Sequence, residues 1–281
     1  MQTLLNTPHE IIQQNILGAA AKARTRILNI LVLGMMAGSF IAMGAQSSSL
    51  AVHNISNVGL ARTLAGCIFP VGLMMIVFVG GELFTGDCMM SMAWMQRKIH
   101  FADMLRTLVL VYVSNFVGAA LIAILVAHSG QYDYSSGVLG AYTIKVAYGK
   151  VHLSFANALV SGILCNILVC VAVLMAAAAK DIAGKVLAIF FPILAFVVSG
   201  FEHCVANMYY IPAGIFASKN AAYAAKALEL YNIDSTQLSS LNWGSFAISN
   251  LIPVTIGNII GGALLVGGAC FYLHGKSLHE S

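Results

Sequence analysis

Hydrophobic residues along the chain gather in long runs that contain no charged side chain. The runs cover residues 27–46, 63–81, 107–127, 154–179, 186–201 and 247–273. Each is close to the roughly 20 residues that a helix needs to cross a bilayer. We therefore predict an all-α integral membrane protein with six transmembrane helices.

The second and fifth runs are interrupted by polar residues, after which the apolar character resumes. The first break reads GGELFTGD and is followed by CMMSMAWM; the second reads GFEH and is followed by CVANMYYIPAGIF. Both segments are predicted to be broken helices. Each is the second of three spans in its half of the chain, so the two halves form inverted repeats. Breaks at matching positions of inverted repeats indicate a solute site near the membrane midplane.

The composition supports a membrane protein and excludes several other classes. The chain of 281 residues is 59% hydrophobic and 9% charged, with net charge +4; a soluble domain has roughly 25% charged residues. The positive charges form no basic run, so nucleic acid is not an expected partner. The cysteines lie in or beside apolar runs without C-x-x-C spacing, which argues against a metal site.

The loop charges predict the orientation, because Lys and Arg favour the cytoplasmic side. Residues 1–26 are interpreted as a cytoplasmic segment with an amphipathic helix, 27–273 as the transmembrane domain and 274–281 as a cytoplasmic tail, in a bacterial inner membrane. The polar stretch 218–245 then forms an external loop with some helix. The cytoplasmic set is Lys22, Arg24, Arg26, Arg97, Lys98, Arg106, Lys180, Lys185 and Lys276; the external set is Arg62, Lys145, Lys150, Lys219 and Lys226.

The segment before the first span carries the signals of a helix start. Thr7 is a predicted N-cap, Pro8 occupies the first helical position, and Glu10 completes a capping box. Such a helix can lie on the membrane surface or take part in gating, and the sequence leaves both alternatives open.

The first break combines flexible backbone with polar groups. Paired glycines allow the chain to leave the helix, and irregular backbone at membrane depth must be buried in protein or line a cavity. Thr85 and free amides at the helix ends can donate to an anion. Glu82 and Asp87 are expected to hold the loop rather than contact the solute.

The second break places His203 inside a span, unlike the other seven histidines. A lone histidine cannot form a bis-histidine haem site, so no cofactor and no catalytic residue are expected. A protonated His203 would attract an anion, and a neutral one would donate or accept a hydrogen bond. Glu202 is expected to bind backbone amides of the break or to set the tautomer of the imidazole.

An anion in a low-dielectric passage loses hydration that donors must replace. The candidates are Thr85, Asn166, His203 and Asn207, although each asparagine can equally serve as an interhelical hydrogen bond. Lys150, just before the fourth span, could raise the anion concentration at the outer mouth, or its side chain could simply reach to the interface.

Several strings make the chain similar to the formate/nitrite transporter family. They are GGELFTG, GILCNILVCVA, SGFEHCVANMYYIPAGI, NLIPVTIGNIIGGALLVG and KVHLSF. The resemblance implies an aquaporin-like fold, a homopentamer with one pore in each protomer, and roles in the pore for Thr85, His203 and Lys150. It also implies an outer hydrophobic constriction at Leu83 and Phe196 and an inner one at Phe69 and Leu73.

Within the family the chain is most similar to the clostridial hydrosulfide channel. Gly81 and Glu82 stand where formate channels are expected to have alanine and aspartate, and Cys204 is a further departure. The resulting hypothesis is a passive, pH-sensitive channel for small monovalent anions: hydrosulfide first, with formate or nitrite close behind. The alternatives are proton-coupled formate or nitrite transport, a neutral-solute pore of the aquaporin kind, and a membrane enzyme that uses Glu202 and His203.

Overall fold

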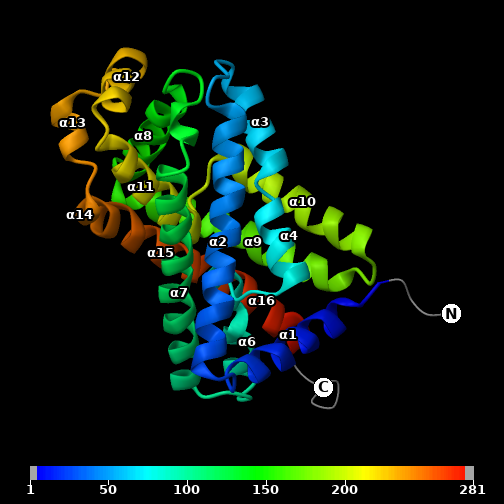
Figure 1. The fold of residues 1–281 in the computed structure, drawn as a ribbon. Helices are drawn as coiled ribbons and strands as arrows, with labels where there is room; N and C mark the ends of the chain where they lie inside the picture. Colours follow the sequence, from blue (N-terminus) through cyan, green and yellow to red (C-terminus); the bar gives the residue numbers. More distant parts are fainter. Residues whose placement is uncertain (1–4, 276–281) are drawn as a thin grey trace.

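The computed structural model describes residues 5–275 and is almost entirely helical (Figure 1). Lys276, His279 and the rest of the predicted tail beyond Gly275 lie outside the described residues. In the first half the helices are α1 (Pro8–Lys22), α2 (Ile27–Val52), α3 (Val58–Ile68), α4 (Val71–Val79), α5 (Phe84–Asp87), η1 (Cys88–Met90), α6 (Ser91–Met95) and α7 (Phe101–Ala127).

The second half begins after a short connection that contains η2 (Gln131–Asp133). Its helices are α8 (Val138–Val151), α9 (Phe155–Ala178), α10 (Ile182–Ser199), α11 (Cys204–Ser218), α12 (Ala221–Tyr231) and α13 (Ser235–Ser239). The last long helix is built from α14 (Trp243–Ser245), η3 (Phe246–Leu251), α15 (Ile252–Ile259), η4 (Ile260–Val266), α16 (Gly267–Cys270) and η5 (Phe271–Gly275).

Six helices within residues 5–275 are long and apolar enough to cross a membrane, as predicted. They are Ile27–Val52, Val58–Val79, Phe101–Ala127, Phe155–Ala178, Ile182–Ser199 and Trp243–Gly275. The second and fifth stop at the predicted breaks, where Gly80 and Gly200 have positive φ angles of 101° and 70°. Glycine adopts such angles at little steric cost, which explains why each helix ends there. The chain is therefore a multi-pass membrane protein.

The two halves use the same kind of close helix contact. In the first half, a Cβ on Gly38 of α2 would lie 2.0 Å from the carbonyl oxygen of Asn115 on α7. In the second half, a Cβ on Gly257 of α15 would lie 2.2 Å from the carbonyl oxygen of Leu159 on α9. Glycine at these crossings lets the backbones approach directly. The first and third spans of each half therefore pack with their backbones in direct contact.

Helices outside the six spans mark two opposite ends of the molecule (Figure 1). Helices α8, α12 and α13 lie at one end, and α1 and α6 lie at the other. We call these the α8 end and the α1 end. The loop charges predict that the α8 end is external and the α1 end is cytoplasmic.

Helix α1 begins with the predicted capping box between Thr7 and Glu10. Its apolar face does not lie free. Ile12 and Ile16 are buried in a cluster with Met89 and Met92, which follow the first break. Because this face packs on protein, α1 is held against the segment that follows the first break.

Candidate functional site

His203 begins α11, and its side chain caps that helix. The main-chain N–H of Ala206 donates to Nδ1 of His203 over 3.1 Å. A neutral imidazole whose Nδ1 accepts carries its proton on Nε2. Nε2 lies 3.0 Å from Oγ1 of Thr85, on the other broken helix. The ring therefore donates to the hydroxyl, and the hydroxyl keeps its own proton for a further acceptor.

This geometry fits the neutral form of His203. Protonating Nδ1 would replace an acceptor with a donor and break the cap on α11. Of the two alternatives left open by the sequence, the arrangement matches a hydrogen-bonding imidazole rather than a resident positive charge.

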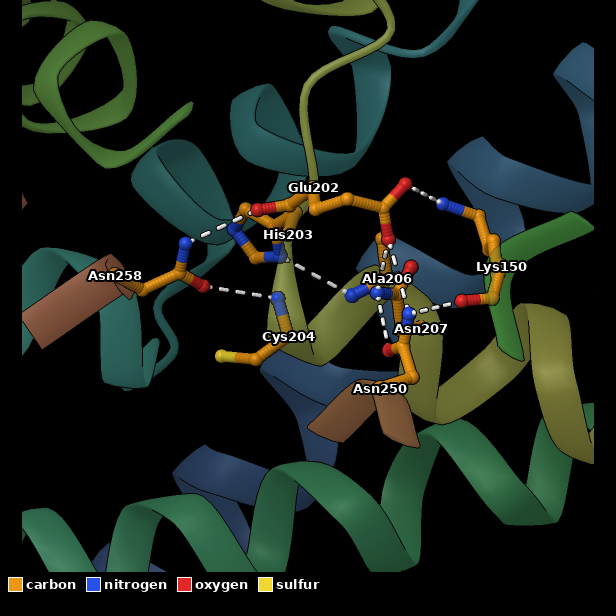
Figure 2. A network of polar contacts seen from close by, with 8 residues as sticks. All are labelled: Lys150, Glu202, His203, Cys204, Ala206, Asn207, Asn250 and Asn258. Atoms are coloured by element: carbon orange, nitrogen blue, oxygen red, sulfur yellow. Dashed lines mark hydrogen bonds and ion pairs between the residues drawn. The ribbon is translucent and has the colours of Figure 1, made fainter. Parts of the chain in front are cut away.

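Glu202 is held by side chains rather than by the backbone amides that we expected (Figure 2). Its Oε1 lies 2.7 Å from Nζ of Lys150, and its Oε2 accepts from Nδ2 of Asn207 over 2.6 Å and of Asn250 over 3.3 Å. The carboxylate is 5% exposed, so these donors replace the water that burial removes. The partly buried Lys150 and the buried Glu202 form a pair with no net charge.

The two asparagines expected to serve an anion have no hydrogen left to donate. Asn166 donates to the carbonyl oxygens of Thr85 (3.1 Å) and Asn258 (2.6 Å). Asn207 donates to Glu202 and to Oδ1 of Asn250. An amide group carries two donor hydrogens, and both are used in each case. Asn166 therefore positions Thr85, and Asn207 positions Glu202. Of the two alternatives that the sequence left open, the structure shows hydrogen bonds between helices rather than hydrogens free for an anion.

Two further asparagines, which the sequence analysis did not single out, hold the breaks. Asn258 on α15 donates to the carbonyl oxygens of Gly162 (2.7 Å) and Glu202 (3.0 Å), and its Oδ1 accepts from the main-chain N–H of Cys204 (2.9 Å). Figure 2 shows the last two contacts. Irregular backbone at membrane depth needs such partners.

Asn115 on α7 makes the equivalent contacts at the first break. It donates to the carbonyl oxygens of Gly34 (2.8 Å) and Glu82 (2.8 Å), and its Oδ1 accepts from the main-chain N–H of Phe84 (3.0 Å). Both asparagines lie in the third span of their half, and this matching position is the signal that could have identified them.

The acidic residue of each break pairs with a lysine from a helix that precedes the repeat. Lys150 in the last turn of α8 pairs with Glu202, and Lys22 in the last turn of α1 pairs with Glu82. Lys22 also contacts Asp87, which occupies the place that Asn207 has in the second repeat. Glu82 was expected to hold its loop through backbone amides, and the structure instead pairs its carboxylate with Lys22 of α1.

The structure does not divide the four predicted constriction residues into an outer pair and an inner pair. The ring of Phe69, predicted for the inner constriction, lies 5.4 Å from that of Phe196 in an edge-to-face arrangement. Phe69 and Phe196 both line one cavity together with His203. They therefore face each other on the α8 side of His203. Leu73 and Leu83 are buried in the same hydrophobic core, with exposures of 3% and 5%.

Two adjoining cavities lead from the α8 end to His203. We call the outer one, of about 650 Å³, the entrance chamber; its lining includes His53, Arg62, Tyr142, Lys145 and Tyr231. We call the inner one, of about 280 Å³, the recess; its lining includes Phe69, Phe196, His203 and Tyr210. Both are bordered by Arg62, Tyr142, Lys150 and Glu202. Solute can thus approach the imidazole from this end.

The arrangement favours passage of a small solute over a reaction. Among residues 5–275 no group of three or more His, Cys, Asp and Glu side chains could hold a metal ion. The donors of Asn115, Asn166, Asn207 and Asn258 at the breaks are used on backbone or side-chain acceptors, whereas the Thr85 hydroxyl keeps its proton beside His203. What the site offers a solute is a hydrogen-bond donor between two broken helices.

Comparison with known proteins agrees with this geometry. The family model described as Formate/nitrite transporter matches residues 9–272. The formate channel BtFdhC of Bacillus thuringiensis is 37% identical, with 96% of each chain covered. The formate channel FocA of Haemophilus influenzae is 36% identical over 89% of this chain and 88% of that one. A solved structure titled "Pentameric formate channel with formate bound" has a TM-score of 0.78 and 31% identity, covering 89% of this chain and 98% of that one. The chain belongs to the formate/nitrite transporter family.

Proposed function

We propose that the protein is a passive channel for small monovalent anions, with formate, nitrite and hydrosulfide as the candidate ions. The supporting observation is the contact between Thr85 and His203, because His203 lines a cavity that opens toward the α8 end and Thr85 lies directly behind its imidazole. An anion there can accept from the Thr85 hydroxyl in place of lost water.

Membership of the formate/nitrite transporter family makes the chain a transport protein and not an enzyme. Two relatives described as formate channels support formate as the first ion to test. Hydrosulfide is the finer proposal, which comes from the resemblance of the sequence. Both are small enough to share one path, and the direct comparison of their fluxes decides between them.

The proposed path runs through the entrance chamber, past Phe69 and Phe196, to the contact between His203 and Thr85. Apolar rings at a narrow point strip water from an ion, and polar groups behind them compensate for that loss. His203 gives the path its proposed pH sensitivity, since protonation would break the cap on α11. Lys150 and Glu202 keep the second break in place.

We further propose a homopentamer in a bacterial inner membrane, with both termini in the cytoplasm. The similar structure described as a pentameric formate channel supports the assembly. Each protomer would carry its own path, because the residues that form it come from a single chain. Native mass spectrometry of the purified protein tests the number of subunits, and a monomer that conducts would contradict the proposal.

The function is tested by anion flux into proteoliposomes at clamped voltage. Formate, nitrite, hydrosulfide and chloride are compared across pH for the wild type and for His203→Asn. The proposal predicts flux of at least one of the first three ions above that of chloride, and a pH profile that His203→Asn alters. Absence of flux for all three ions would exclude the channel, and an unchanged profile would exclude the role of His203.

Proton-coupled transport is the second candidate, because Nε2–H of His203 and the Thr85 hydroxyl form a pair that could pass a proton to an anion. The two functions differ in their response to a proton gradient at a fixed anion gradient and membrane potential. Net flux that follows the proton gradient would favour coupling, and flux independent of it would favour the passive channel.

A further inference from the structure

The charges around the entrance chamber do not cancel. Its lining contains the cations Arg62, Lys145 and Lys150 and the carboxylate of Glu202. Lys150 and Glu202 neutralise each other at 2.7 Å. Lys150 therefore cannot be the group that attracts anions to this mouth, because its charge is already compensated by a buried partner.

Arg62 and Lys145 remain without an acidic partner in the part of the chain that the structure describes. Nη1 of Arg62 donates to the carbonyl oxygen of Val198 over 3.1 Å, which leaves its charge uncompensated. Nζ of Lys145 lies 4.6 Å from the ring centre of Tyr231 and 5.8 Å from that of Tyr142. These contacts fix the ammonium group over aromatic rings without neutralising it.

The two uncompensated cations approach the chamber from different elements. Arg62 comes from α3 and Lys145 from α8, and Tyr142 of α8 borders the same cavity. A concave surface lined by one sign of charge concentrates the field and raises the local concentration of counter-ions. The chamber, at about 650 Å³, is also much larger than the recess of about 280 Å³ that follows it.

We propose that Arg62 and Lys145 form an anion-binding site in the entrance chamber, separate from the contact between Thr85 and His203. The site captures a monovalent carboxylate before it enters the recess. It also accepts a small dicarboxylate. The larger chamber accommodates such an ion, and the rings of Phe69 and Phe196 exclude it from the recess. The part of this inference that concerns conduction rests on the proposed function.

The conduction test measures formate current from the α8 side as a function of formate concentration, with the full-length protein in a planar bilayer. Arg62→Gln and Lys145→Gln remove one charge each. Each is expected to raise the half-saturating formate concentration by about three- to tenfold at low salt, with little change in current at saturation. The increase should disappear at about 1 M salt, where the screening length falls to about 3 Å.

Matched variants separate charge from structure. Arg62→Lys and Lys145→Arg keep the charge and should restore most of the apparent affinity. Lys219→Gln removes a cation from the end of α11, where Nζ lies over the ring of Phe216 and not in the lining of either cavity. It is expected to leave the half-saturating concentration unchanged. Equal effects of Lys219→Gln and Lys145→Gln would overturn the site in favour of general surface charge.

A binding test with malonate does not depend on conduction. Malonate on the α8 side should block formate current, and it should raise the unfolding temperature of the detergent-solubilised wild type. Both effects should weaken in Arg62→Gln and Lys145→Gln. If the wild type passes no anion, the proposed function fails, and the malonate-induced stabilisation still decides on the site. If malonate neither blocks nor stabilises the wild type, or acts equally on the Gln variants, the site is excluded.

Discussion

Nε2 of His203 lies 3.0 Å from Oγ1 of Thr85, and this contact joins the two broken helices through polar side chains. The imidazole is fixed by the helix that it caps, and Thr85 is fixed by Asn166 through its carbonyl oxygen. The donor offered to a solute is thereby held in place before the solute arrives, which reduces the cost of reorganisation.

Thr85→Val should lower formate flux by about tenfold to a hundredfold, because a hydrogen bond to a charged group contributes about 1.5–3 kcal/mol. Valine keeps the shape and removes the hydroxyl. Thr85→Ser restores the donor and should retain most of the flux. Initial rates in proteoliposomes provide the measurement, and a Val variant that conducts like the wild type would show that the hydroxyl is not needed.

Asp87→Asn should stabilise the protein, and Asn207→Asp should destabilise it. Lys22 faces the two carboxylates of Glu82 and Asp87, and Oδ2 of Asp87 is buried without a hydrogen-bond partner. Asparagine there would remove an uncompensated charge and could donate to Glu82, whereas Asn207→Asp would place a second carboxylate beside Lys150.

We expect each change to amount to about 1–3 kcal/mol, with opposite signs. Thermal unfolding of the purified variants at neutral pH is the measurement. If both substitutions shift the unfolding temperature in the same direction, the two positions are not equivalent in the way that their contacts indicate.

Lys150→Met should cost about 3–5 kcal/mol of stability, because it leaves Glu202 as a buried carboxylate without its counter-charge. Adding Glu202→Gln should recover much of the loss, because the glutamine is neutral and keeps an acceptor for Asn207. The double-mutant cycle measured by unfolding gives the coupling between the two groups. Additive effects would contradict the pairing.

Gly200→Ala should destabilise the protein more than Gly130→Ala. Both glycines have positive φ, 70° and 78°, so the conformational penalty is similar. A Cβ on Gly200 would lie 2.5 Å from Nη1 of Arg62 and would push the end of this flexible side chain away from the carbonyl oxygen of Val198, whereas one on Gly130 would meet nothing within 4 Å. The extra loss, measured by thermal unfolding, is expected to be that of one hydrogen bond, about 0.5–1.5 kcal/mol, and equal losses would rule out its contribution.

Phe196→Ala should let larger anions through. Phe69 and Phe196 meet edge to face beside His203, so truncating one ring widens the recess. Acetate and lactate fluxes relative to formate should rise, with formate itself less affected. Swelling of vesicles in each salt is a direct measurement. If the ratios of acetate and lactate flux to formate flux in Phe196→Ala equal those of the wild type, the selective step lies elsewhere along the path.

The sequence predicted the spans and both breaks because these depend on local composition. The ends of the spans were less predictable. The first span was expected to stop at residue 46, yet α2 continues to Val52, and the single hydroxyl hydrogen of Ser48 is satisfied within the bundle by the carbonyl oxygen of Gly44 (2.8 Å), with that of Ala65 also near (3.2 Å). Polar residues that appear to end a hydrophobic run can therefore be satisfied inside the bundle.

The partners of the polar groups could not be predicted, because they depend on how distant helices meet. Lys22 was counted as a cytoplasmic charge, and its contact with Glu82 follows from the packing of α1 on the bundle. Asn166 and Asn207 were named as candidate donors to an anion, with a hydrogen bond between helices as the equal alternative. Whether their hydrogens were free to donate could not be read from residue type alone.

The equivalence between Asn115 and Asn258 has a consequence for how this architecture can diversify. Each half of the chain contains one asparagine that holds its broken backbone in place. Only the second half contains a histidine at its break, and the matching position in the first half is Leu83. A substitution at position 203 that keeps an acceptor for the Ala206 amide, or an apolar one at position 83, leaves the contacts of Asn115 and Asn258 intact. New selectivities can therefore arise at these two positions while the backbone of both breaks stays in place.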